Sequence, residues 1–218
     1  MSKRYENILL DLDGTLVDSA PDIISGVKKA FAEVSGREPA VPAGLIGFQL
    51  REILLGIDPG LSRENVAELA AAFRRNYDDC GFPGTTLYPG AGEALSAIKD
   101  SGAKIFLVTN KPSKPTRAIL LKLGVDLFDS VICSDSEPGG KLSKDEMVRL
   151  LIKRRGFGKS SAVMAGDTET DLLAARNNGI AAAAALYGYG DPVKLLALAP
   201  DYTLPDISGL PRLVINGR

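Results

Sequence analysis

ILLDLDGTLVDS, residues 8–19, is the stretch that decides the fold of this chain. Its apolar start is typical of a strand that is buried on both faces of a sheet. Asp11 and Asp13 follow two residues apart, and extended backbone aims side chains at that spacing toward the same face. Gly14 permits a sharp turn directly afterwards, and Thr15 adds a hydroxyl group. Because neighbouring carboxylates repel each other, the pair needs a cation or a shared proton. The stretch therefore predicts a magnesium-assisted active site at a strand end.

The composition is that of an ordinary globular protein and excludes several classes of function. The 218 residues suffice for one large core, or for a core with a small second domain. A net charge of −1 gives no bulk attraction to nucleic acid or to an anionic membrane. The chain contains no histidine, which excludes Ser-His-Asp triads and histidine-ligated zinc sites. Acid–base chemistry must therefore fall to carboxylates or lysines.

No segment of the sequence indicates export or insertion into a membrane. The longest apolar run, residues 180–186, is far shorter than the ~20 residues of a membrane helix. The basic N-terminus is followed by too short an apolar segment for a signal peptide. Cys80 and Cys133 stand alone and far apart, as expected of reduced thiols. We therefore expect a cytoplasmic protein with no membrane or nucleic-acid partner.

Residues 17–85 are predicted to be mostly helical. Apolar side chains recur at helical spacing in residues 23–34 and again in residues 66–77. Residues 45–55 suggest a further short helix, interrupted near Gly47. No strand pattern of any strength is present in this block, and residues 81–84 break the chain before the next element.

From residue 86 onward the pattern changes to alternating helices and strands. After the strand at residues 8–10, further buried strands are expected at residues 103–108, 130–133, 161–165 and 180–186. Helices are expected between them, at residues 90–101, 115–123, 143–155 and 171–177. Strands separated by helices of about ten residues predict an α/β fold with a doubly wound parallel sheet. Residues 1–16 and 86–218 would form this core, and residues 17–85 a small inserted helical cap domain over its carboxyl edge.

Polar residues follow two later strands of the predicted sheet, and both groups would meet Asp11 at the carboxyl edge. Thr109 and Asn110 offer a hydroxyl and an amide, which suit phosphoryl oxygens. Asp167 and Asp171 lie four residues apart around a helix start, where negative charge is favoured. Carboxylate oxygens are also the ligands that Mg²⁺ prefers, so Asp167 is a candidate metal ligand.

Together these motifs resemble those of the haloacid dehalogenase (HAD) superfamily of phosphatases. Residues 11–19 resemble its first motif, residues 109–111 its second, and the Gly-Asp…Asp pattern of residues 166–171 its fourth. The resemblance covers nearly the whole chain and implies a HAD-like Rossmannoid core with an inserted cap. Dehalogenases of this superfamily lack an acid at the position of Asp13, so its presence favours phosphoryl transfer.

The resemblance also implies a role for each motif residue. Asp11 would attack phosphorus to form an aspartyl-phosphate, and Asp13 would protonate the leaving alcohol and then activate water. The cofactor would be Mg²⁺, held by Asp11, the backbone oxygen of Asp13 and Asp167, with Asp171 ordering the first coordination shell. The phosphate would be held by Thr15, Thr109, Asn110 and a lysine.

Two lysines are candidates for that role. Many HAD phosphatases carry a Lys-Pro-x-Pro pattern, and this chain lacks both prolines after Lys141. Nucleotidase-like relatives carry Lys-acid-acid-apolar-apolar-Arg, and KDEMVR at residues 144–149 matches that pattern. We therefore favour Lys144 and keep Lys141 as the alternative.

The cap would select the substrate, which we expect to be a small phosphorylated metabolite. Residues 18–22 resemble the cap start of phosphoglycolate phosphatases, whereas residues 186–190 lean toward nucleotidase-like relatives. Residues 45–51 resemble the cap's substrate loop, which makes Gly47 and Arg51 candidate substrate contacts; a solvated helix arginine remains an equal alternative for Arg51. Monomer and homodimer both remain open.

The expected activity is Mg²⁺-dependent hydrolysis of a phosphomonoester, with 2-phosphoglycolate as the first candidate substrate. A 5′-nucleotidase is the alternative of the same chemistry. A non-catalytic phosphate-sensing domain is a third hypothesis, which the complete set of acids disfavours. Receiver domains also combine acids with Thr and Lys, but they lack an inserted helical block.

Overall fold

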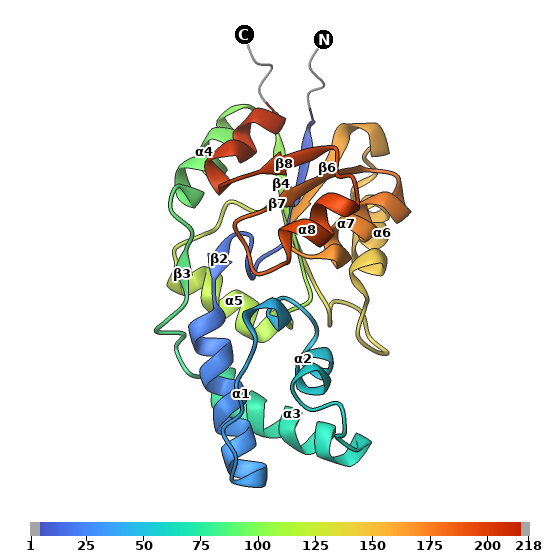
Figure 1. The fold of residues 1–218 in the computed structure, drawn as a ribbon. Coiled ribbons are helices and arrows are strands. Elements are labelled where there is room, and N and C mark those ends of the chain that lie inside the picture. The colour runs from blue at the N-terminus through green and yellow to red at the C-terminus, as the bar shows by residue number, and fades with distance from the viewer. Residues whose placement is uncertain (1–4, 215–218) are drawn as a thin grey trace.

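The computed structural model describes residues 5–214, and its centre is a six-stranded parallel sheet (Figure 1). The strands lie in the order β5-β4-β1-β6-β7-β8. Their bounds are β1 (Asn7–Leu10), β4 (Lys104–Thr109), β5 (Ser130–Cys133), β6 (Ala162–Gly166), β7 (Ala181–Ala185) and β8 (Tyr202–Leu204). From the central β1 the chain winds outward through β4 and β5, then returns to β6 and winds the other way. This order confirms the doubly wound α/β fold and places the switch point beside β1.

Helices cover both faces of this sheet because successive strand residues point to opposite sides. Ile8 and Leu10 of β1 belong to the core on one face, and Leu9 belongs to the core on the other. The first face is covered by α4 (Ala91–Asp100), α5 (Ser113–Lys122) and the 3-10 helix Ile207–Leu213. The second face is covered by α6 (Lys144–Arg155), α7 (Glu169–Asn178) and α8 (Pro192–Ala197). A further 3-10 turn, Lys159–Ser161, leads into β6.

A separate group of helices lies beyond the carboxyl ends of the strands (Figure 1). It consists of α1 (Ala20–Ser35), the 3-10 turn Ala43–Leu45, α2 (Leu50–Ile57) and α3 (Arg63–Tyr77). The helix predictions for this block are confirmed, and the interruption near Gly47 is the segment between the 3-10 turn and α2. Phe31 of α1 and Tyr77 of α3 are buried in the apolar core of this group. We refer to α1, α2 and α3 with their connections as the helical layer.

A two-stranded ribbon carries the chain into and out of the helical layer. It pairs β2 (Val17–Asp18) antiparallel with β3 (Thr86–Leu87). The expectation that residues 17–85 contain no strand is therefore wrong for β2, because two residues are too few to produce an alternating pattern. The expected boundaries at residues 17 and 86 coincide with the first residues of these strands.

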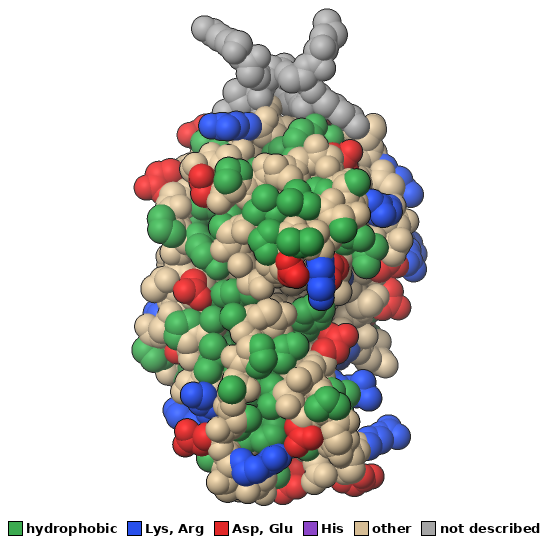
Figure 2. Space-filling model, viewed as in Figure 1, with side chains coloured by type: hydrophobic (Ala, Val, Ile, Leu, Met, Phe, Trp, Pro, Cys, Tyr) green, Lys and Arg blue, Asp and Glu red, His purple; other side chains and the backbone are tan. Residues whose placement is uncertain are grey.

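The last part of the chain is more regular than its sequence indicates. The sequence pattern gives no element after the strand at residues 180–186, yet α8, β8 and the 3-10 helix follow it. These elements are three to seven residues long, too short for a helical or strand period to emerge. Within residues 5–214, no helix has both the length and the apolar character needed to cross a bilayer. On the face in Figure 2, acidic and basic side chains are interspersed.

Candidate active site

Three buried aspartates come together where β1 and β6 end. Asp11 follows β1, Asp167 follows β6, and Asp171 lies in the first turn of α7. Each offers a carboxylate oxygen, and these oxygens all lie within 4.8 Å of one another. The parallel pairing of Leu10 with Ala165 brings the two strand ends to the same height. A Cβ atom at Gly166 would lie 2.2 Å from the carboxyl carbon of Asp171, so only glycine permits this approach.

Lys144 provides the positive charge in this group. Its Nζ atom lies 2.7 Å from Oδ1 of Asp11, 2.8 Å from Oδ1 of Asp171 and 3.0 Å from the carbonyl oxygen of Val108. Lys144 is the first residue of α6, and a capping box formed by Ser143 with Glu146 fixes the start of that helix. Burial disfavours its charge, but Asp11 and Asp171 more than offset this and raise the pKa of Lys144.

Three carboxyl groups surround this one lysine, and the pKa values of Asp11 and Asp167 are raised. Burial raises the pKa of Asp11 well above its ordinary range, although Lys144 opposes the shift. Burial and the neighbouring Asp171 raise the pKa of Asp167 to about 7. A divalent cation among these oxygens would favour their ionised forms again. The buried, oxygen-only donor set fits Mg²⁺.

Asp167 is held in place from two sides. Its Oδ1 atom accepts a hydrogen bond of 2.9 Å from the Thr15 hydroxyl, and its Oδ2 atom accepts one of 2.9 Å from the backbone N–H of Tyr189. Gly14 has φ +85°, and a Cβ atom there would lie 2.1 Å from Oδ2. A Cβ atom at Gly188 would lie 2.3 Å from the Asp167 Cβ atom. The loop of residues 188–190 packs directly on Asp167, and the close approach leaves no room for a side chain at Gly188.

Asp171 is engaged at both carboxylate oxygens. Oδ1 faces Lys144, and Oδ2 accepts hydrogen bonds of 3.1 Å from the Thr168 backbone and 2.7 Å from the Thr168 hydroxyl. These contacts tie Asp171 to Lys144 and to the start of α7.

The Asp13 carboxylate lies apart from the three acids, although it shares a motif with Asp11. Lys111 Nζ donates to its two oxygens at 2.9 and 3.0 Å, and the Ser19 hydroxyl donates to Oδ1. Its side chain is therefore not part of the acidic group found in the described chain. If Asp13 contacts a metal ion at this group of acids, it does so through its backbone oxygen, as expected from the sequence.

The end of β4 touches the helical layer. Thr109 is buried, and its hydroxyl accepts a hydrogen bond of 3.1 Å from the Lys111 backbone N–H. The Asn110 amide donates to the Gly47 carbonyl oxygen at 3.0 Å. Gly47 has φ +93°, a conformation that favours glycine. The structure thus brings Asn110, beside Thr109 at the end of β4, into contact with Gly47 of the helical layer.

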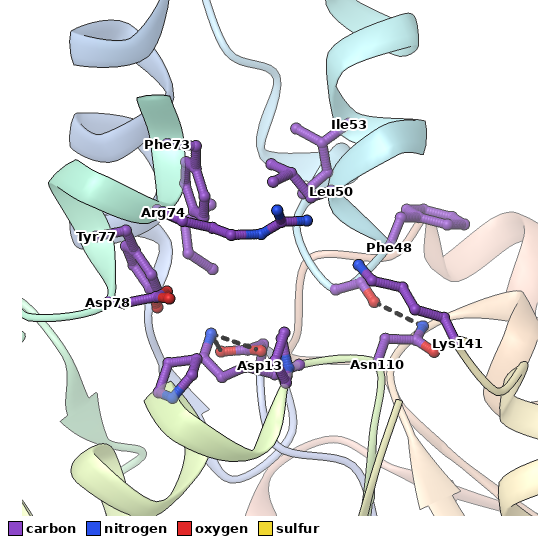
Figure 3. A pocket seen from close by; sticks show the side chains of 15 residues that line it. Asp13, Phe48, Leu50, Ile53, Phe73, Arg74, Tyr77, Asp78, Asn110 and Lys141 are labelled. Atoms are coloured by element: carbon purple, nitrogen blue, oxygen red, sulfur yellow. Dashed lines mark hydrogen bonds and ion pairs between the residues drawn. The ribbon is translucent and has the colours of Figure 1, made fainter. Parts of the chain in front are cut away.

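A cavity separates the sheet from the helical layer (Figure 3). Asp13, Asn110 and Lys111 line it from the sheet, and Lys141 reaches it from the loop before α6. The helical layer contributes mainly apolar side chains: Ile23, Phe48, Leu50, Ile53, Phe73 and Tyr77, with Arg74 and Asp78 among them.

Arg51, the arginine expected at this site, is exposed on α2 and does not line the cavity. Arg74 of α3 does. The sequence contains a signal for Arg74 that the prediction did not use. It follows Phe73 and precedes Tyr77 by three residues, which places it at the edge of the apolar face of α3. Lys111 lies within the second motif, residues 109–111, and the sequence predicts no role for it.

Tyr189, which the sequence does not predict as a site residue, connects the three aspartates to residues 18–20, where the chain enters the helical layer. Its hydroxyl donates to Asp18 at 2.7 Å and accepts from the backbone N–H groups of Ser19 and Ala20 at 2.8 and 3.0 Å. Its own backbone N–H binds Asp167, so one residue contacts both places.

We expect Tyr189→Phe to lower the free energy of unfolding by about 1–3 kcal/mol, because three polar groups lose a hydrogen bond to the Tyr189 hydroxyl in a largely buried place. Urea denaturation measures the change. Tyr202→Phe is the matched control, since it loses only a 3.3 Å contact with the Tyr5 hydroxyl. Equal stabilities of the two variants would contradict the prediction.

Comparisons with known proteins give a consistent result. The model of the haloacid dehalogenase-like hydrolase family matches residues 8–185. A phosphoglycolate phosphatase of Vibrio vulnificus (strain YJ016) is 33% identical, with 95% of each chain covered. A 5′-nucleotidase of Pseudomonas aeruginosa is 29% identical, over 95% of this chain and 94% of its own. The crystal structure of a predicted phosphoglycolate phosphatase from Haemophilus somnus 129PT matches with a TM-score of 0.85 and 25% identity, covering 97% of this chain and 98% of that one.

Proposed function

Because this chain belongs to the haloacid dehalogenase-like hydrolase family and is a phosphatase of that family, we propose that it hydrolyses a small phosphomonoester through an aspartyl-phosphate. One observation carries the proposal: Asp11 lies among buried acids beside Lys144, while Asp13 faces a cavity on the other side. The nucleophile and the acid of a two-step displacement need this separation, because one must reach phosphorus and the other the leaving oxygen.

In the first step, the Asp11 carboxylate attacks phosphorus and the ester bond breaks. Lys144 lies against Asp11 and supplies positive charge where negative charge develops on the transferring phosphoryl group. Thr109 and Asn110 lie at the end of the neighbouring strand and would bind the phosphoryl oxygens.

Asp13 would give its proton to the leaving alkoxide and then take one from the water that attacks the aspartyl-phosphate. That water restores Asp11 and releases inorganic phosphate. Asp13 suits this role because it lines the cavity, whereas Asp11 does not. Lys111 and Ser19 hold the Asp13 carboxylate in that direction.

Asp11, Asp167 and Asp171 are the side chains that would hold Mg²⁺ or order its ligands, together with the Asp13 backbone oxygen. When bound, the ion supplies positive charge that offsets the repulsion between the carboxylate nucleophile and the phosphate. We propose in addition that the helical layer is a cap and that the β2–β3 ribbon is its hinge, since both chain connections pass through that ribbon. Closure of such a cap would exclude water from the site.

Removal of Mg²⁺ by a chelator is expected to reduce phosphate release to background, and added Mg²⁺ is expected to restore it. The physical reason is that, within residues 5–214, Lys144 is the one cation that forms ion pairs with this group of three buried carboxylates. Initial rates before and after dialysis against the chelator provide the measurement. An undiminished rate in metal-free protein would rule out the metal's role.

The proposed substrate is 2-phosphoglycolate, as the names of several relatives suggest. The deciding experiment measures phosphate release with Mg²⁺ from a panel of esters that includes 2-phosphoglycolate and nucleoside 5′-monophosphates. Highest kcat/KM for 2-phosphoglycolate supports the proposal, and highest kcat/KM for nucleotides favours the alternative, which the 5′-nucleotidase relative suggests. No release from any ester would reject a phosphatase and favour a phosphate-sensing domain.

A further inference from the structure

We propose that Arg74 and Lys141 form an anion site that selects phosphomonoesters whose leaving group carries a carboxylate. This inference rests on the proposed phosphatase activity and assigns its specificity to two residues. Arg74 belongs to α3 of the helical layer, and Lys141 belongs to the loop between β5 and α6. Figure 3 shows their cationic ends entering the cavity from opposite sides.

Within the part of the chain that the structure describes, neither cation has a carboxylate oxygen within ion-pair distance. The ion pairs among residues 5–214 include neither Arg74 nor Lys141. The neighbouring Arg75, in contrast, pairs with Glu33. Unpaired cations on a surface are ordinary, but two that face one cavity beside a reacting group are a candidate anion site.

The charges lining the cavity leave room for an anion. Lys111 is paired with Asp13, so Arg74 and Lys141 face one further carboxyl group among the lining residues, that of Asp78. Burial raises the pKa of Asp78, so its negative charge is also disfavoured. Burial and the nearby Arg74 lower the pKa of Lys141. An anion between the two cations would relieve that repulsion.

The size of the cavity indicates a small leaving group. Its volume is about 60 Å³. A water molecule needs roughly 10–15 Å³ on this measure, so the cavity holds roughly four to six heavy atoms. That room suits a short hydroxy acid. Leu50, Ile53 and Phe73 line part of the wall with apolar atoms.

The test compares two esters of similar size, 2-phosphoglycolate and ethyl phosphate, which differ in the carboxylate. For the unmodified protein we expect kcat/KM to be at least tenfold higher for 2-phosphoglycolate. Arg74→Gln and Lys141→Gln should each lower the ratio of the two kcat/KM values by about tenfold, and the double variant by more, because each removes a charge-assisted contact. Arg75→Gln is the matched control and should leave the ratio unchanged, since Arg75 is paired with Glu33 outside the cavity.

A binding measurement separates this inference from the proposed function. In an Asp11→Asn background, calorimetric titration with 2-phosphoglycolate should give a Kd that rises at least tenfold when Arg74 and Lys141 are both replaced by Gln. Circular dichroism and thermal unfolding verify that the variants fold.

Three results would overturn the inference: an unmodified protein that prefers ethyl phosphate, a ratio that the two substitutions leave unchanged, or an equal fall in Arg75→Gln. Preference for propanediol bisphosphate over 2-phosphoglycolate would also overturn it, because the second anion would then be a phosphate. Failure to hydrolyse any ester would instead reject the proposed function, and the calorimetric comparison would still decide whether this anion site exists.

Discussion

Asp11→Asn is expected to lower kcat by about 10³-fold or more on every phosphomonoester, because an amide oxygen does not replace the carboxylate as the nucleophile. The fold should survive. Burial disfavours the charge of Asp11, so the neutral Asn has almost the same shape without that cost. Lys144 keeps its contact with Asp171. Phosphate release and thermal unfolding, measured on the same preparation, test both halves of the prediction.

Asp79→Asn is a suitable control for this experiment, since Asp79 is exposed and pairs only with Lys114 on the surface. It should retain full activity. If Asp11→Asn also retained full activity in the folded state, Asp11 would not be the nucleophile. Loss of activity in both variants would point to an indirect effect of charge.

Lys144→Met should have the second largest effect, and it acts on stability as well as on activity. The substitution leaves Asp11 and Asp171 buried without their cation. Removing one partner of a buried pair costs about 3–5 kcal/mol of unfolding free energy. The loss of positive charge near the transferring phosphoryl group should lower kcat by about 10²-fold or more. Urea denaturation in a chelator measures the first effect, and initial rates with Mg²⁺ measure the second.

Lys141→Met is the matched variant and distinguishes the two lysines that the sequence leaves open. Lys141 has no ion pair within residues 5–214 and is exposed, so its loss should change the unfolding free energy by less than about 0.5 kcal/mol. Its effect on activity should be confined to the choice between esters. A larger loss of stability in Lys141→Met than in Lys144→Met would contradict this assignment.

The fold followed from the sequence because its signals are local. A buried parallel strand is a continuous apolar run, and helices of ten residues or more show their period within a few turns. The strand at residues 8–10 and the strand ending before Asp167 could both be recognised in this way, and parallel strands end at one edge. The expectation that Asp11, Asp167 and Asp171 meet therefore needed no knowledge of side-chain contacts.

The tertiary structure alone decided which residues complete the site. Lys144 and Lys141 lie three residues apart in one loop-to-helix segment, and only the packing of α6 on the sheet turns the first toward Asp11 and leaves the second at the cavity. Arg74 and Tyr189 reach the site from α3 and from the loop after β7, outside the motifs that contain Asp11, Thr109 and Asp167. A local pattern fixes where a strand ends. Which distant side chains face that end depends on how the helical layer and the last loop pack against it, and no short stretch of sequence contains that information.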